Sequence, residues 1–339
     1  MLAIVIIYLW LAILLYFLLG GADFGAGIIE LFTSPRQIRR TRETLYQAIG
    51  PVWEANHMWL IIAIVILFVG FPLIYSTLSV HLHIPILIML VGIIARGTAF
   101  VFRHYDAVKD SMQHVYNRIF VWSSFITPLF LGIIAGATVS DKIDPDADTF
   151  ADVFVFPWLN LFSISVGFFT VALCGFLAAV YLVGEADNDA DRTRFIRKAR
   201  NANVIAFALG FLVFGAAASE GVPLVGWVFG DKVGLFAVVA ATLSLVILWT
   251  VINRGNNLVA RGLVAFQVTM ILLAISYAHF PDLVLMRSGE NLSLLKHHAP
   301  AKTIDALGWA LLLGSVFILP ALFYLYYSFQ RRDGEKGFV

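Results

Sequence analysis

The sequence predicts an all-α integral membrane protein with about nine transmembrane helices, which form one membrane domain over residues 1–339. Of the 339 residues, 60% are apolar and only 13% are charged, against about 25% charged residues in a typical soluble domain. The mean hydropathy is +0.87, and long apolar runs recur along the whole chain. These observations exclude a soluble enzyme, a disordered chain and a small disulfide-stabilised scaffold.

Nine apolar runs are long enough to cross a bilayer, whose core of about 30 Å needs roughly 20 residues of helix. The first run lacks a preceding basic segment and is too long for a cleavable signal peptide, so we expect it to be a spanning helix. The expected spans are Leu2–Phe32, Val52–Ser76, Leu82–Phe102, Phe120–Ala137, Trp158–Val183, Val204–Ser219, Val233–Ile252, Leu263–Phe280 and Ala306–Phe329.

Most of the 23 lysines and arginines fall on one side of these spans, in alternate loops and in the C-terminal tail. Because cytoplasmic loops are enriched in Lys and Arg, the pattern predicts an outer N-terminus and a cytoplasmic C-terminus. The cations on this side are Arg36, Arg39, Arg40, Arg42, Arg103, Lys109, Arg118, Arg192, Arg194, Arg197, Lys198, Arg200, Arg254, Arg261, Arg331, Arg332 and Lys336.

Charge and cysteine content exclude several functions. The net charge is +1, so there is no basic excess for nucleic-acid binding. Cys174 is the single cysteine, which excludes an internal disulfide and a cysteine-based metal cluster. The chain has no Gly-rich phosphate loop and cannot be an ATP-driven pump by itself.

Few ionisable residues interrupt the apolar spans. Asp23 lies in GGADFGAG of the first span, Glu54 and His57 lie in GPVWEANHMW of the second, and Arg96 lies in the third. A charge at membrane depth costs at least ~2.5–3.5 kcal/mol on insertion scales, so each is a functional candidate. Glu30, at the inner end of the first span, is interpreted as interfacial and set aside.

The predicted orientation places these candidates in the cytoplasmic half or at the midplane. At 1.5 Å per residue, Asp23 lies roughly 15 Å from the inner edge, with Glu54 about one turn and His57 about two turns inside it. Consecutive helices with short connections usually pack as neighbours. We therefore expect Asp23, Glu54, His57 and Arg96 to form a path that relays protons from the cytoplasm.

Structural interpretations compete with this path. Asp23 and Arg96 can form a buried ion pair that only fixes helix register, and Glu54 can be hydrated at the interface. His57 favours a hydrogen-bonding role over metal ligation. No second histidine lies at its depth in another span, so we expect no metal site and no heme ligated by this chain.

Three motifs together, GADFGAG, GPVWEANHMWL and ARGTAFVFR, resemble subunit II of the cytochrome bd-type quinol oxidases, including the cyanide-insensitive branch. The resemblance implies a respiratory terminal oxidase that oxidises quinol and reduces oxygen to water. It implies a heme-free subunit built from two four-helix bundles and one peripheral helix. The first bundle covers about 1–139, and the second bundle together with the last helix covers about 157–329. Its partner, subunit I, would carry the b-type hemes and heme d.

The resemblance also assigns roles to residues. Asp23 matches the family's buried acid after the glycines of the first span, Glu54 matches the acid after Pro-x-Trp of the second, where many relatives have Asp, and Arg96 matches the arginine that begins the third motif. The subunit is expected to contribute residues to proton entry from the cytoplasm. Some relatives have an acid where this chain has Val101, so a path through that acid cannot exist here in the same form. His57 stands where relatives often have an amide.

Further partners follow from the same resemblance. Trp53 matches the motif tryptophan, and Trp53 and Trp59 are candidates for contact with quinone or lipid. Some family members hold a structural quinone in this subunit, and a small single-helix accessory subunit can accompany the pair. We expect a multi-pass protein of the bacterial cytoplasmic membrane that supports assembly of subunit I and contains no catalytic residue of its own.

Two other functions remain open at this point. Intramembrane charges also suit an independent secondary transporter or a proton or ion channel, although no pair of spans shows matching Gly or Pro breaks at the midplane. The third possibility is a purely structural partner that stabilises a catalytic chain. Solute flux through liposomes containing this chain alone would favour the transporter.

Overall fold

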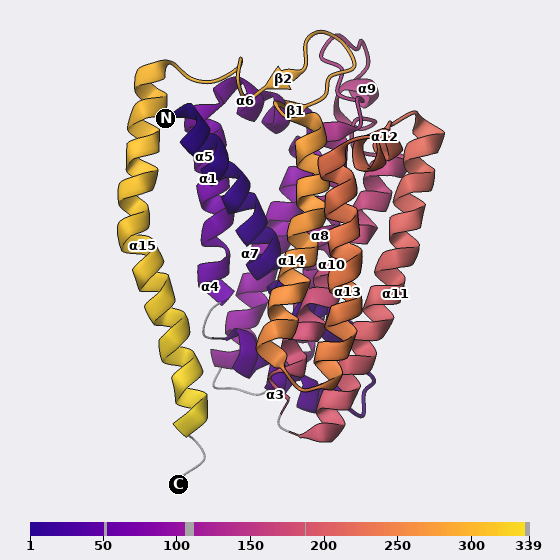
Figure 1. The fold of residues 1–339 in the computed structure, drawn as a ribbon, viewed down its shortest axis with the longest axis vertical. Coiled ribbons are helices and arrows are strands. Elements are labelled where there is room, and N and C mark those ends of the chain that lie inside the picture. The colour runs from indigo at the N-terminus through magenta and orange to yellow at the C-terminus, as the bar shows by residue number, and fades with distance from the viewer. Residues whose placement is uncertain (51–52, 106–111, 187, 336–339) are drawn as a thin grey trace.

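A computed structural model describes residues 1–50, 53–105, 112–186 and 188–335. Within these residues, nine helical segments are long and apolar enough to span a membrane, which confirms the predicted fold class (Figure 1). The segments are Leu2–Leu31, Trp53–Gly70, His83–Arg103, Met112–Val139, Leu161–Val183, Asp189–Glu220, Lys232–Asn253, Asn257–His279 and Ala301–Leu325. The division into two four-helix bundles stays a prediction.

These spans are built from shorter elements. In chain order the elements are α1 (Leu2–Leu15), η1 (Tyr16–Gly20), α2 (Gly21–Leu31), α3 (Ile38–Ile49), α4 (Trp53–Asn56), α5 (Met58–Gly70), α6 (Pro72–His81), α7 (His83–Tyr105), α8 (Met112–Val139), α9 (Phe150–Phe154), α10 (Leu161–Val183), α11 (Asp189–Glu220), α12 (Leu224–Phe229), α13 (Lys232–Asn253), α14 (Asn257–His279), β1 (Asp282–Val284), β2 (Leu292–Ser293) and α15 (Ala301–Glu335).

Helix α10 is the central element, and it packs against α2, α8, α11 and α14. Its small residues allow close helix crossings, which are the main source of packing between helices in a bilayer. At the crossing with α2, a Cβ on Gly25 would lie 1.9 Å from the carbonyl oxygen of Cys174. Only glycine fits there, so this crossing fixes α2 and with it the position of Asp23.

The second span differs from its predicted form. The sequence predicts one helix to Ser76, but α5 ends at Gly70 and α6 begins at Pro72. This prediction was wrong because Phe71 leaves the helical conformation and Pro72 has no N–H to continue the hydrogen-bond ladder. A second break lies at His57, between α4 and α5.

The sixth span extends beyond its apolar run. Asn188 accepts a hydrogen bond from the backbone N–H of Asp191 and caps α11 there, fifteen residues or so before the predicted start at Val204. The added turns are charged, and Lys198 of this segment donates to the carbonyl oxygens of Ile29 and Phe32 at the end of α2. Helix α11 therefore covers the end of the first span.

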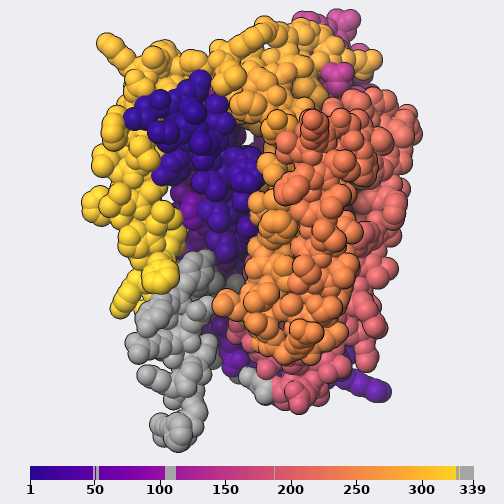
Figure 2. Space-filling model, in the orientation of Figure 1, coloured from indigo at the N-terminus to yellow at the C-terminus, as the bar shows by residue number. Residues whose placement is uncertain are grey.

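Two long loops meet at the end of the molecule that holds the N-terminus (Figure 1). Strands β1 and β2 pair as an antiparallel hairpin, and Met286 bridges to Ile143 of the acidic loop after α8. The Ser288 hydroxyl donates to the Asp144 carboxylate in the same contact. At one side, α15 packs along α1 and α5 (Figures 1 and 2).

Candidate functional site

The first span carries an irregularity just before its buried acid. Residues Tyr16–Gly20 form a π-helical turn, and Asp23 lies in the first turn of α2 directly after it. Turns of this kind occur frequently at functional sites. The turn leaves both Tyr16 and Asp23 buried, so the first span directs two polar side chains into the protein interior.

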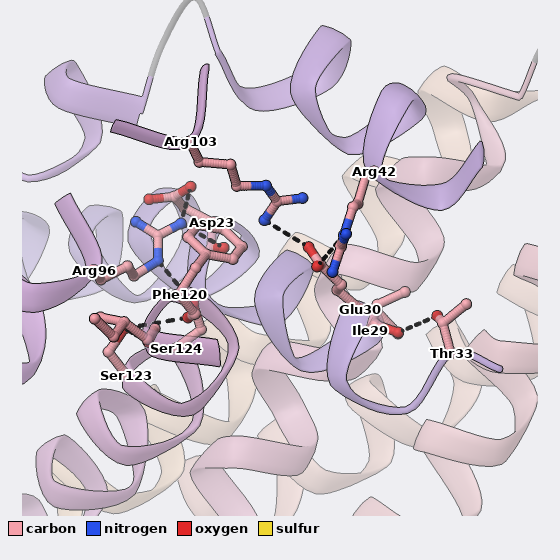
Figure 3. A network of polar contacts seen from close by, with 11 residues as sticks. Asp23, Ile29, Glu30, Thr33, Arg42, Arg96, Arg103, Phe120, Ser123 and Ser124 are labelled. Carbon is pink, nitrogen blue, oxygen red and sulfur yellow. Dashed lines mark hydrogen bonds and ion pairs between the residues drawn. The ribbon is translucent and has the colours of Figure 1, made fainter. Parts of the chain in front are cut away.

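Asp23 forms a fully buried ion pair with Arg96 of α7 (Figure 3). Arg96 Nη2 donates to Asp23 Oδ1 at 2.6 Å and to the Asp23 carbonyl oxygen at 3.0 Å. Its Nε donates to Ser124 Oγ of α8 at 3.0 Å. The guanidinium carbon lies 5.2 Å from the centre of the Phe24 ring and 5.1 Å from that of Phe120. One arginine thus joins three spans.

His57 adds an imidazole to this pair from the break between α4 and α5. Its Nε2 lies 3.7 Å from Asp23 Oδ2, and its ring centre lies 6.0 Å from that of Tyr16 and 5.6 Å from that of Phe24. The structure thus brings together three of the four residues of the predicted path, Asp23, His57 and Arg96, and their role in proton transfer stays a prediction.

Four buried polar atoms of this cluster have no hydrogen-bond partner among the described residues: Tyr16 Oη, Asp23 Oδ2, His57 Nδ1 and Arg96 Nη1. Buried polar atoms are nearly always hydrogen-bonded, so these atoms retain the capacity to bind water or to exchange protons. Tyr16 was not recognised from the sequence, because a tyrosine in an apolar run has no distinguishing signal.

Glu54 is not part of this buried cluster. Its side chain is exposed on α4, three residues before His57. Trp53 packs against Phe100, with ring centres 5.2 Å apart, and Trp59 lies partly buried against the hydrophobic core. The structure therefore gives the two tryptophans packing contacts, and their contact with quinone or lipid stays a prediction.

Glu30, interpreted from the sequence as interfacial and set aside, forms two ion pairs inside the protein. It is fully buried, its Oε1 accepts from Arg42 Nε at 2.6 Å, and its Oε2 accepts from Arg103 Nη1 at 2.9 Å (Figure 3). The Arg103 guanidinium carbon lies 4.9 Å from the centre of the Phe120 ring, whose ring also contacts Arg96. The sequence signal for these ion pairs is the presence of Arg42 and Arg103 near the ends of other helices. Because both arginines are distant from Glu30 in the sequence, no local pattern indicates that they pair with it.

The chemistry available to these residues is proton exchange and charge stabilisation. The formal charges of the two carboxylates and three arginines sum to +1, and a proton on His57 would add one more positive charge. These residues are Asp23, Glu30, Arg42, Arg96 and Arg103. Among the described residues, no group of three or more His, Cys, Asp and Glu side chains is arranged to hold a metal ion.

Comparison with known proteins gives consistent matches over the whole chain. The family "Cytochrome bd terminal oxidase subunit II" matches residues 1–329. The cytochrome bd ubiquinol oxidase subunit 2 of Bacillus subtilis is 25% identical, over 95% of this chain and 93% of its own length. A putative cytochrome bd menaquinol oxidase subunit II of the same organism is 19% identical, over 97% and 95%. The bd oxidase structure from Geobacillus thermodenitrificans shares the fold, with a TM-score of 0.77 and 20% identity over 96% of this chain and 98% of that one.

Proposed function

The chain belongs to the cytochrome bd terminal oxidase subunit II family, and from this premise we propose that it is the heme-free subunit of a respiratory quinol:oxygen oxidoreductase. In this proposal it supports assembly of subunit I and contributes to proton uptake from the cytoplasm. The hemes of subunit I supply the electron transfer and oxygen chemistry when bound there. The chain itself contributes the membrane scaffold and ionisable side chains.

The observation that carries the proton role is the incompletely satisfied cluster around Asp23. A pair that only fixed helix register would be expected to satisfy its polar atoms, because unpaired buried groups destabilise the fold. Here one oxygen of Asp23 faces His57, and four polar atoms retain bonding capacity. Imidazole is the side chain best suited to exchange protons near neutral pH.

The path we propose starts at Glu54 and runs inward. Glu54 is exposed on α4 and receives a proton from water, and His57 lies one helical turn away at the α4–α5 break. His57 passes the proton toward Asp23, whose negative charge stabilises the imidazolium while Arg96 holds the carboxylate in place. The excess of Lys and Arg in the adjacent loops supports the assignment of this side as cytoplasmic, and uptake from that side would conserve energy when oxygen is reduced.

The test uses the purified complex with subunit I, reconstituted into liposomes with a pH indicator on the cytoplasmic side. Glu54→Gln and His57→Gln should lower quinol oxidase turnover and proton uptake together, while the heme absorption spectrum stays unchanged. Glu43→Gln is the matched control, because Glu43 is an exposed acid on α3 outside the cluster. Wild-type turnover and proton uptake in both the Glu54→Gln and the His57→Gln variant would overturn the proposed path.

A further inference from the structure

A second group of charged residues lies at the end of the molecule opposite the N-terminus, where α3 meets the first turns of α11 (Figure 1). Residues 36–49 and 189–200 contain nine cations and only three acids. Such a local excess of positive charge attracts anions. The cations are Arg36, Arg39, Arg40, Arg42, Arg192, Arg194, Arg197, Lys198 and Arg200, and the acids are Glu43, Asp189 and Asp191.

Asp191 joins the two helices through two arginines. It is buried at the start of α11, and its Oδ2 lies 2.5 Å from Arg40 Nε of α3. Its Oδ1 lies 3.0 Å from Arg194 Nη2, one turn along α11. Two guanidinium groups thus converge on a single carboxylate, so one positive charge at this junction has no counter-charge in the group.

Arg194 also retains hydrogen-bond donors that are not used. Its side chain is only 13% exposed, and its Nε and Nη2 are buried without a hydrogen-bond partner among the described residues. Buried donors of a charged group are costly to leave unbonded. A guanidinium is well suited to donate two parallel hydrogen bonds to the oxygens of a phosphate or a carboxylate, so Arg194 indicates an anionic ligand.

Two further arginines of α11 extend this positive surface outward. Arg197 and Arg200 are exposed, and neither has a carboxylate partner among the described residues. Arg197 follows Arg194 by three residues, a spacing that places two side chains next to each other on a helix surface. An anion at Arg194 is therefore within reach of a second, solvent-accessible guanidinium.

The depth of the junction distinguishes a membrane lipid from a soluble anion. Lys198 Nζ donates to the carbonyl oxygen of Phe32 at 3.1 Å and to Thr33 Oγ1 at 2.9 Å, at the end of the first span. Arg194 lies one turn beyond Lys198, roughly 6 Å along α11. The headgroup layer beside the hydrocarbon core is roughly 5–8 Å thick on each side, so Arg194 lies at the level of lipid phosphates.

Apolar surface for the acyl chains follows on the same helix. Val204 and Ile205 of α11 are 63% and 53% exposed, and they lie about two turns from Arg197 toward the middle of the span. A lipid whose phosphate lies at Arg194 would therefore extend its chains along an apolar helix surface.

We propose that the junction of α3 and α11 binds the phosphate headgroup of an anionic phospholipid. Arg194 and Arg197 donate to the phosphate oxygens, while Asp191 holds Arg194 and Arg40 in position. Clusters of about four to eight Lys and Arg residues beside a spanning helix are typical of anionic-lipid binding. A zwitterionic lipid lacks the net charge that this surface selects. The site is separate from the Asp23 cluster and does not depend on the proposed proton path.

The test uses the purified, delipidated complex in an uncharged detergent, with binding measured by isothermal titration calorimetry. The probes are dioctanoyl phosphatidylglycerol, dioctanoyl phosphatidylcholine and inorganic phosphate. Wild type should bind phosphatidylglycerol saturably, and the other two probes at least tenfold more weakly. Arg194→Gln and Arg197→Gln should each weaken phosphatidylglycerol binding by roughly fivefold. The heme absorption spectrum checks that each variant is assembled, and exposed Arg197 provides a test that does not perturb the buried ion pairs.

Arg118→Gln is the matched control, because Arg118 is an exposed arginine of α8, outside both segments of this cluster; it should bind as wild type does. Equal affinity for inorganic phosphate would identify a soluble-anion site and contradict the lipid assignment. The proposal would also be wrong if phosphatidylcholine bound as tightly as phosphatidylglycerol, if wild type showed no saturable binding, or if Arg194→Gln and Arg197→Gln left the affinity unchanged.

Discussion

Replacing Asp23 by Asn should destabilise the complex strongly, because the Arg96 guanidinium would stay buried without its carboxylate. The pair is fully buried and its closest contact is 2.6 Å. Removing one member of such a pair typically costs about 3–5 kcal/mol, whereas replacing both members is often neutral or stabilising. We therefore expect Asp23→Asn and Arg96→Gln each to lose several kcal/mol, and the double variant to recover most of that loss.

The assay is a double-mutant cycle on the purified complex, with unfolding followed by heme absorbance and turnover measured with quinol. The exposed pair Arg39–Glu43, with a closest contact of 3.4 Å on α3, provides a matched control cycle. Its coupling should be about 0.5 kcal/mol or less, as is usual for exposed i, i+4 pairs.

The cycle separates the two interpretations of the pair. If Asp23 takes part in proton transfer, the double variant regains stability but its turnover stays roughly 10²-fold or more below wild type. If the pair only fixes helix register, stability and turnover recover together. A stable Asp23→Asn variant would refute the burial argument itself.

Three further predictions concern other parts of the fold. Gly25→Ala should prevent normal assembly of the complex, measured as its yield on size exclusion, because the added Cβ would meet the Cys174 carbonyl oxygen at 1.9 Å. Glu30→Gln should destabilise the complex by about 3–5 kcal/mol without changing proton uptake, both measured on the reconstituted protein. The Ser288 hydroxyl bond holds the pKa of Asp144 below its usual range, so the contact between the two long loops should be intact above the ordinary Asp pKa of about 4 and weaken as the pH falls through the lowered value. Ser288→Ala should move this loss to higher pH in hydrogen exchange of the loop amides, and an unchanged midpoint would contradict the assignment.

The sequence predicted the spans well because bilayer thickness imposes a length on each apolar run, independent of tertiary contacts. The meeting of Asp23, His57 and Arg96 was also predictable, since each is a polar residue at similar depth on consecutive helices. The break at Phe71 was missed although Pro72 follows it, because the apolar run itself continues through the break.

Other features depend on contacts that no local pattern records. Glu30 lies at the end of a span, and its partners Arg42 and Arg103 come from different helices, α3 and α7. Tyr16 has no distinguishing signal within its apolar run, and it is the π-helical turn that places it beside the cluster.

Burial alone does not distinguish the two acids of α2, since Asp23 and Glu30 are both fully buried and both pair with arginine. They are seven residues apart, roughly 10 Å along the helix, and the Phe120 ring lies between their arginines. What differs is the remaining hydrogen-bond capacity.

Both oxygens of Glu30 accept from arginine, which suits a permanent anion that ties α2 to α3 and α7. Asp23 has only one oxygen bound to arginine, and the other faces a histidine. A group can exchange protons only where a site for the proton stays open. The proton chemistry therefore belongs to the less completely paired acid, and Glu30 provides the structural attachment beside it.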